Sequence, residues 1–404
     1  MTRKQGLVSF STIALLLAGI GPALGQSSAR KSGSASQKGS DSFEQIARRA
    51  DHERQAGRLD EAIRLYREGV KMRPKWDEGW WYLATMLYDQ DKYDEARDAF
   101  KVLVAAQPKN GPAAAMLGLC EFETRDYERA LSELERAHTL GLGTNEELMS
   151  VTRYHTGILS TRVERFEAGH EALLAFAHQQ NDSAKIIEAF GLNILMMPLL
   201  PSEIPPDRRD LVMLAGRAAF YMAAMRQAEA VKSFEQLVAR YPAEPNVHYA
   251  YGVFLLAEQS DAALAEFKRE LEISPNHIYS ILQIVFEYIK RTDYATALPY
   301  AQKAVQLAPN ESAGHNALGR VLLEMGTLDL ALSELELAAR IAPNSPQAHF
   351  ALAHAYSRVG RKADAARERA TFLRLDAESR AQREGPQSVG GTGAQPKPNE
   401  NSPK

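Results

Sequence analysis

Histidines beside carboxylates are the residues of this sequence with which metal binding or catalysis would begin. His170 and Glu171 are the first two residues of a two-histidine zinc motif, but Leu174 stands where the second histidine is needed. His349 and His354 are five residues apart, so on one straight helix they diverge by about 140° and cannot share a metal ion. We therefore expect no catalytic residue, no metal site and no cofactor.

Other reactive residue types are isolated. Gly141-Leu142-Gly143 lacks the lysine of a phosphate loop, and we expect a turn there. His248, His315 and His349 occupy equivalent places, and we expect packing and a capping hydrogen bond from each. Cys120 is the single cysteine, so no internal disulfide can form, and its apolar neighbours predict a small buried residue.

Composition favours a folded protein without a nucleic-acid partner. The chain has 404 residues, of which 45% are hydrophobic and 25% charged, values ordinary for a globular protein. Lys and Arg number 48 against 51 Asp and Glu, and a nucleic-acid site needs a basic face. The length exceeds one ordinary domain, which an array of repeats allows because each repeat packs only on its neighbours.

Three series of residues recur at a step of 34 or 33 in two runs. The alanines are Ala62, Ala96, Ala130, Ala230, Ala263, Ala297, Ala331 and Ala365. The prolines are Pro74, Pro108, Pro242, Pro275, Pro309 and Pro343, and the small residues are Ala50, Ala84, Gly118, Ala218, Gly252, Gly319 and Ala353. A fixed period of this size indicates an array of small repeated units.

One repeat, residues 312–343, indicates what each unit contains. Apolar residues from Ala331 onward follow the i, i+4, i+7 spacing of one helix face, and a similar face precedes them. Gly326 suits a left-handed helix cap between the two, and Pro343 ends the second helix. Each unit is therefore expected to be two antiparallel helices, with alanine and glycine where the helices cross closely.

These features resemble the tetratricopeptide repeat family. The second unit matches the family pattern at Trp80, Leu83-Ala84, Tyr88, Ala96, Phe100 and Pro108. A later unit matches at Leu318-Gly319, Ala331, Ala338 and Pro343, and the resemblance covers roughly residues 43–379. It implies an all-α fold, an α-solenoid that is a right-handed superhelix of antiparallel helix pairs, and a non-enzymatic scaffold for protein or peptide partners.

The resemblance also implies that the first helix of each pair lines a concave groove. The side chains expected to point into it are Trp81, Tyr88, Phe122, Tyr154, Tyr249, Phe286, Asn316, Arg320, Phe350, His354 and Arg358. Aromatic side chains with interspersed Arg and Asn suit an extended peptide or a partner helix. Phe122 and Tyr154 could equally pack between units, and the Lys–Asn–Lys–Arg clamp of some members is not recognisable.

The repeat is interrupted between Pro108 and Pro242. Residues 184–210 read as an apolar helix followed by a proline-rich segment, with four prolines in the nine residues 198–206. The interruption would divide the chain into an N-terminal array at 43–183 and a C-terminal array at 211–384, which ends in a capping helix. It is either a hinge or wedge, or a contact for a partner or a second copy.

The two ends of the chain predict export and flexibility. Residues 1–25 have the charged start, apolar core and small residues of a signal peptide, which would place the protein in the periplasm or outside a bacterial cell. An uncleaved membrane anchor is the alternative for this segment. The alternative function is an accessory subunit of an envelope enzyme or assembly machine, which such an anchor could tether to the membrane. Residues 26–42 are expected to be a flexible linker and 385–404 a disordered tail.

Overall fold

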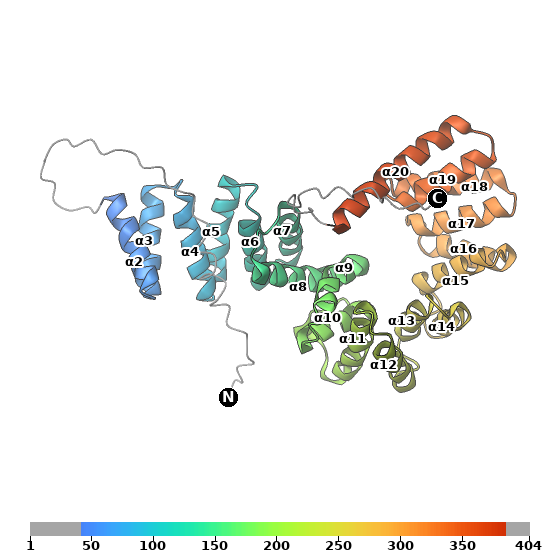
Figure 1. Cartoon of the computed structure of the whole chain (residues 1–404), viewed down its shortest axis with the longest axis horizontal. Helices are drawn as coiled ribbons and strands as arrows, with labels where there is room; N and C mark the ends of the chain where they lie inside the picture. The colour runs from blue at the N-terminus through green and yellow to red at the C-terminus, as the bar shows by residue number, and fades with distance from the viewer. Residues whose placement is uncertain (1–41, 385–404) are drawn as a thin grey trace, which may run out of the picture. The chain divides into compact units, whose positions relative to one another are not determined.

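A computed structural model describes residues 42–384 of the chain, and every regular element in this range is a helix (Figure 1). The all-α prediction is confirmed. The predicted signal peptide, nearly all of the predicted linker and the predicted tail lie outside the described residues. Within residues 42–384, no helix combines the length and apolarity that a bilayer-spanning segment requires.

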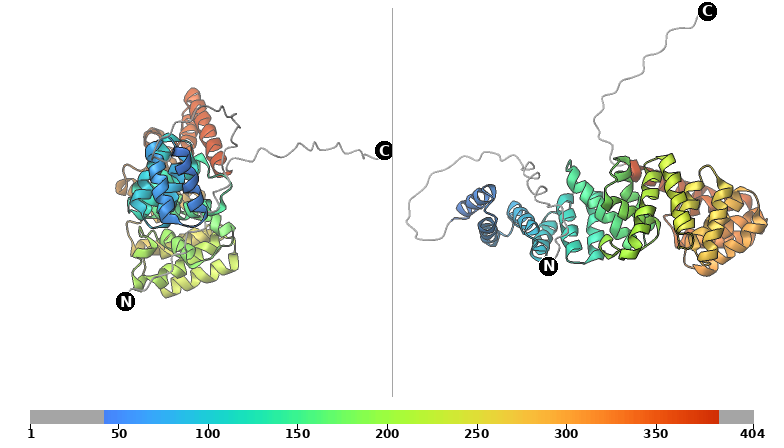
Figure 2. Two further views of the ribbon diagram at one scale, coloured as in Figure 1. Left: turned by 90° about the vertical axis from the view of Figure 1, so that its left-hand side faces the viewer. Right: turned by 90° about the horizontal axis from the view of Figure 1, so that it is seen from below.

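The described helices form two compact units, and the first ends at Arg240. Its first eight helices stand in consecutive antiparallel pairs whose members lie side by side (Figures 1 and 2), and the middle one of its last three helices packs against both of its neighbours. They are α2 (Phe43–Gln55), α3 (Leu59–Met72), α4 (Asp77–Asp89), α5 (Tyr93–Ala106), α6 (Gly111–Glu123), α7 (Tyr127–Leu140), α8 (Glu146–Arg162), α9 (Phe166–His178), α10 (Ala184–Ile194), α11 (Arg209–Ala223) and α12 (Gln227–Arg240), with the short 3-10 turns η2 (Pro201–Glu203) and η3 (Pro206–Arg208).

The second unit begins at Tyr241 and has the same hairpin plan. Its helices are α13 (Val247–Leu255), α14 (Ser260–Ile273), α15 (Ile278–Lys290), α16 (Tyr294–Leu307), α17 (Ser312–Glu324), α18 (Leu328–Ile341), α19 (Pro346–Arg358) and α20 (Lys362–Glu384). Consecutive helices pack in pairs, and the first helices α15, α17 and α19 also contact one another in order. We call the surface of these three helices the first-helix face of unit 2.

The periodic alanines and small residues lie at the helix crossings, as predicted. All eight alanines of the series are at most 4% exposed. A Cβ added to Gly319 on α17 would lie 2.5 Å from Cγ of Leu335 and 3.2 Å from the carbonyl oxygen of Ala331 on α18. A larger side chain would therefore push the two helices apart. Gly326, between α17 and α18, has φ +83°, the left-handed conformation predicted for it.

Each proline of the periodic series has its carbonyl oxygen bonded by a side chain of the hairpin that follows it. Trp80 Nε1 donates to Pro74 at 2.9 Å, and histidine Nε2 atoms contact three others: His248 to Pro242 at 3.0 Å, His315 to Pro309 at 2.9 Å and His349 to Pro343 at 2.9 Å. Arg136 and Lys303, on second helices, donate to Pro108 and Pro275 at 2.6 Å each. These bonds satisfy carbonyls that the end of a helix leaves without a partner.

The predicted interruption at 184–210 is not where the compact units divide, because the division lies after Arg240. The reason is a close backbone crossing between α10 and α11. A Cβ at Gly191 would collide with the carbonyl oxygen of Val212, and one at Gly216 with that of Ile187. The proline-rich segment thus joins two closely packed helices of the same unit, and its side chains Leu200 and Ile204 are buried.

Candidate functional site

The first-helix face of unit 2 brings several of the predicted groove residues together around one pocket. Arg320, Phe350 and His354 line this pocket, which has a volume of about 190 Å³. Two further predicted residues adjoin it through these side chains, because Phe286 lies under Arg320 and Arg358 pairs with the pocket residue Glu324. The sequence-based list therefore includes a real cluster formed by α15, α17 and α19.

Arg320 extends over an aromatic ring instead of pairing with a carboxylate. Its guanidinium carbon lies 5.6 Å from the centroid of the Phe286 ring, a favourable cation–π distance. Burial lowers the pKa of this guanidinium, although the residue as a whole is exposed. A guanidinium has five N–H donors, and the described residues provide no ion-pair or hydrogen-bond partner for those of Arg320.

Apolar side chains form the rest of the pocket. Phe350 is 61% exposed, which is unusual for a large aromatic, and its ring centroid lies 5.3 Å from that of Phe372 on α20. Five further pocket residues were not predicted from the sequence, namely Ile289, Tyr294, Leu323, Glu324 and Ala351. Four of them lie on the first helices, within a turn of the predicted residues, so the helical i, i+3, i+4 spacing could have found them.

The other two predicted residues of unit 2 lie deeper. Asn316 on α17 is 8% exposed, and its Oδ1 atom has no hydrogen-bond partner in the described structure. Tyr249 on α13 is half-buried, with its ring 4.8 Å from His277 and 6.0 Å from Tyr279. Tyr279 is 39% exposed, so this aromatic group reaches the surface through a residue that was not predicted.

The predicted groove residues of unit 1 are packed more deeply than expected of an open groove. Tyr88 is 6% exposed. Trp81 is half-buried, with its ring centroid 5.8 Å from that of Phe100 on the second helix of its hairpin. The ring centroids of Phe122 and His155 are 4.6 Å apart, and Nζ of Lys185 lies 5.4 Å from the centroid of the Tyr154 ring. At Phe122 and Tyr154 the structure thus favours packing between neighbouring repeats within unit 1. This is one of the two roles that the sequence left open for them.

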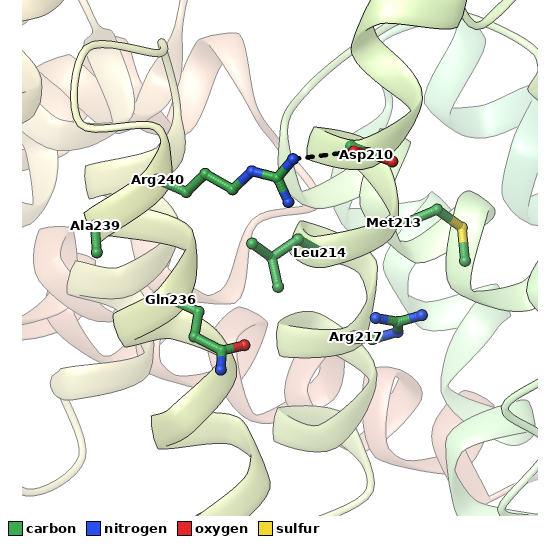
Figure 3. A pocket seen from close by; sticks show the side chains of 7 residues that line it. All are labelled: Asp210, Met213, Leu214, Arg217, Gln236, Ala239 and Arg240. Atoms are coloured by element: carbon green, nitrogen blue, oxygen red, sulfur yellow. Dashed lines mark hydrogen bonds and ion pairs between the residues drawn. The ribbon is translucent and has the colours of Figure 1, made fainter.

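A second pocket, which the sequence did not indicate, lies in unit 1. It has a volume of about 610 Å³ and is lined only by α11 and α12, through Asp210, Met213, Leu214, Arg217, Gln236, Ala239 and Arg240 (Figure 3). Arg240 reaches from α12 to Asp210 on α11, with a nitrogen–oxygen distance of 3.0 Å. No predicted groove residue lies in it.

The histidines that first suggested metal chemistry have structural contacts. The Nδ1 atoms of His248, His315 and His349 lie 2.5, 2.5 and 2.6 Å from carboxylate oxygens of Glu266, Glu334 and Glu368. Both nitrogens of each ring are therefore engaged in the predicted hydrogen-bonding role. In the range 42–384, no group of three or more His, Cys, Asp or Glu side chains is arranged to hold a metal ion.

Cys120 and the glycines of 141–143 also have the predicted structural roles. Cys120 is fully buried, and burial raises the pKa of its thiol, so little reactive thiolate forms. Gly141 and Gly143 both have positive φ values, +86° and +67°, in the turn after α7. This is turn geometry.

Comparisons with known proteins agree with the fold. Two family models, both described as tetratricopeptide repeat, match residues 48–111 and 221–278, and residues 288–354. The chain is 25% identical to anaphase-promoting complex subunit 3 of Schizosaccharomyces pombe over 68% of this chain and 42% of that protein. It is 24% identical to TPR repeat-containing protein MJ1428 of Methanocaldococcus jannaschii over 79% of this chain and 54% of that protein.

The chain thus spans about half the length of these curated relatives. A solved structure of MamA from Desulfovibrio magneticus matches with 18% identity and a TM-score of 0.38, over 42% of this chain and 96% of that structure. The repeat matches and the helix pairs with their alanines in register show that this chain is a tetratricopeptide repeat protein.

Proposed function

We propose that the chain is a non-enzymatic scaffold that binds a partner protein or peptide on the first helices of its hairpins. The main support is the pocket on the first-helix face of unit 2, where exposed Phe350, Arg320 and His354 lie together. Exposed aromatic and arginine side chains are the residues that most often dominate binding energy at interfaces. Trp81, half-buried on the first helix α4, is proposed as a separate contact for a partner in unit 1.

Alanine variants test this proposal. Phe286→Ala and Trp81→Ala are expected to reduce recovery of the partner from a bacterial envelope extract, while circular dichroism shows that both variants remain folded. Leu330→Ala is the matched control, because Leu330 is as exposed as Phe350 but lies on a second helix, α18. Normal recovery by both test variants would remove the first helices as the binding surface.

We further propose that the protein is exported and acts in the periplasm or outside the cell. The support is the signal-like sequence of residues 1–25. The alternative is a membrane-tethered accessory subunit of an envelope enzyme or assembly machine, and membership of a complex fits the name of the Schizosaccharomyces pombe relative. Mass spectrometry of the mature chain separates the two, because loss of residues 1–25 means free export and their retention means tethering.

A further inference from the structure

We propose that the pocket of unit 2 binds an acidic side chain of a partner peptide together with a large apolar side chain next to it. Arg320 would bind the carboxylate, and Phe350 would contact the apolar side chain. This inference rests on the proposed scaffold function and specifies the chemistry of the partner at one place.

The charges around the pocket favour an acidic group. The carboxylate of Glu324 is paired with Arg358 at 3.3 Å. Glu287 on α15 is buried away from the pocket, where Lys290 donates to it at 2.5 Å and the hydroxyl of Ser260 at 2.8 Å. Arg320 forms no hydrogen bond or ion pair with a carboxylate among the described residues, and the attraction of Glu324, one turn away on α17, only partly opposes the lowering of its pKa by burial.

The position of Arg320 prepares it for a carboxylate. Its guanidinium carbon lies 5.6 Å from the centroid of the Phe286 ring, and none of its N–H groups donates a hydrogen bond to another described residue. A guanidinium binds a carboxylate through two parallel hydrogen bonds, and a charge-assisted bond of this kind is roughly twice as strong as a neutral one. A paired carboxylate would also stabilise the charged guanidinium and so oppose the lowering of its pKa by burial.

The walls of the pocket favour an apolar neighbour for that acidic group. Ile289, Leu323 and Ala351 line it, and Phe350 stands 61% exposed at its side. Burying such an aromatic against a partner removes a large apolar area from water. The partner segment should therefore contain Asp or Glu adjacent to Leu, Ile, Met or Phe.

The size of the pocket favours a side chain of a longer partner over a free small molecule. Its volume of about 190 Å³ is below the range of roughly 300–1,000 Å³ typical of small-molecule sites. One or two side chains of a peptide fit this space, while the rest of the peptide would contact the neighbouring first helices.

The experiment uses the intact chain and a displayed library of random twelve-residue peptides. The selected peptides are expected to contain an acidic residue beside a large apolar one. The best peptide is then synthesised with a fluorophore in two forms, one with its Glu or Asp and one with the corresponding amide. Fluorescence anisotropy should show that the acidic form binds about 10-fold more tightly or better, the size of a charge-assisted hydrogen bond.

Variants assign this preference to Arg320. Arg320→Gln should remove the difference between the two peptides, and Arg320→Glu should prefer a peptide with Lys at the same place. Arg340→Gln is the matched control, because Arg340 is exposed on the second helix of the same hairpin. The thermal midpoint of each variant checks that the fold is intact.

Three results would overturn the inference: a selection without acidic residues or without any binding peptide, equal affinity for the two peptide forms, or a preference that survives Arg320→Gln. None of these removes the scaffold function. That function fails by a different result, namely normal partner recovery by the Phe286→Ala and Trp81→Ala variants.

Discussion

The Nδ1 atom of His248 lies 2.5 Å from Oε2 of Glu266, while Nε2 of the same ring lies 3.0 Å from the carbonyl oxygen of Pro242. Both partners accept hydrogen bonds, so the ring satisfies both only when both of its nitrogens have a proton. The hydrogen bond that His248 donates to Glu266 accordingly raises the pKa of His248, against the opposing effect of burial.

This relationship predicts that unit 2 is more stable at mildly acidic than at alkaline pH. Because the folded-state pKa of His248 is raised, its stabilising contribution is complete below the unfolded value of about 6.5. The contribution is lost as pH rises through the folded value. Urea unfolding from pH 5.5 to 8.5 should show this loss for the wild type.

His248→Leu should remove that part of the pH dependence and lower the free energy of unfolding by about 1–3 kcal/mol at pH 6, because the carbonyl of Pro242 and part of Glu266 lose a partner. Glu270 and Arg269 also face this site. The His354→Gln variant removes an exposed histidine elsewhere in unit 2 and is therefore the control for a general effect of losing a histidine charge. A variant with the pH dependence of the wild type would show that His248 is not the titrating group.

Glu121 predicts a second pH effect, in unit 1. Its side chain is buried, its Oε2 atom has no partner, and burial raises its pKa to about 7. Because the folded pKa is raised above the unfolded one, stability should fall as pH rises from the unfolded value through about 7. Glu121→Gln should therefore be more stable than the wild type at pH 8 by about 1–3 kcal/mol, and thermal melts at pH 5 and pH 8 should show the advantage only at pH 8.

The alanine series predicts where the array does not tolerate volume. Ala96→Trp and Ala331→Trp would overpack fully buried crossings and should each destabilise by about 1–3 kcal/mol or more. Ala105→Trp is the control, because Ala105 is exposed on the same helix as Ala96. Equal thermal midpoints for Ala96→Trp and Ala105→Trp would contradict the register of the hairpins.

Two glycines predict different costs for the same small change. At Gly319 the nearest atom to a new Cβ belongs to the side chain of Leu335, whereas at Gly191 it is the backbone carbonyl of Val212. A side chain can move more easily than a packed helix backbone, so Gly191→Ala should lower the thermal midpoint more than Gly319→Ala. A larger loss for Gly319→Ala would mean that α10 and α11 do not approach as closely as described.

Much of the fold could be predicted because the repeat constrains it. Ala331 and Gly319 recur where two backbones nearly touch, so their size alone identified the crossing and the helix pair. The region around Gly191 and Val212 was harder, because α10 and α11 are joined by a proline-rich segment that breaks the period. The sequence indicated a break there but not that the two helices pack together.

The site was predicted less completely than the fold. First-helix positions such as Arg320 and Phe350 follow from helical spacing, but exposure depends on the size of neighbouring side chains, which a periodic pattern does not specify. Tyr88 is buried for this reason, with Tyr93 packed against it. The ion pair of Glu324 with Arg358, and not with Arg320 on its own helix, could not be inferred without coordinates.

The hydrogen bonds to the proline carbonyls also determine how neighbouring hairpins depend on one another. In unit 2, Lys303, His315 and His349 each reach back to the proline before their own hairpin. Melting of one hairpin therefore deprives the preceding one of its terminal bond, about 1 kcal/mol of nearest-neighbour coupling for each step. Amide protons should consequently exchange fastest at α20 and progressively more slowly toward α15, so the unit should fray from its end and not open at its centre.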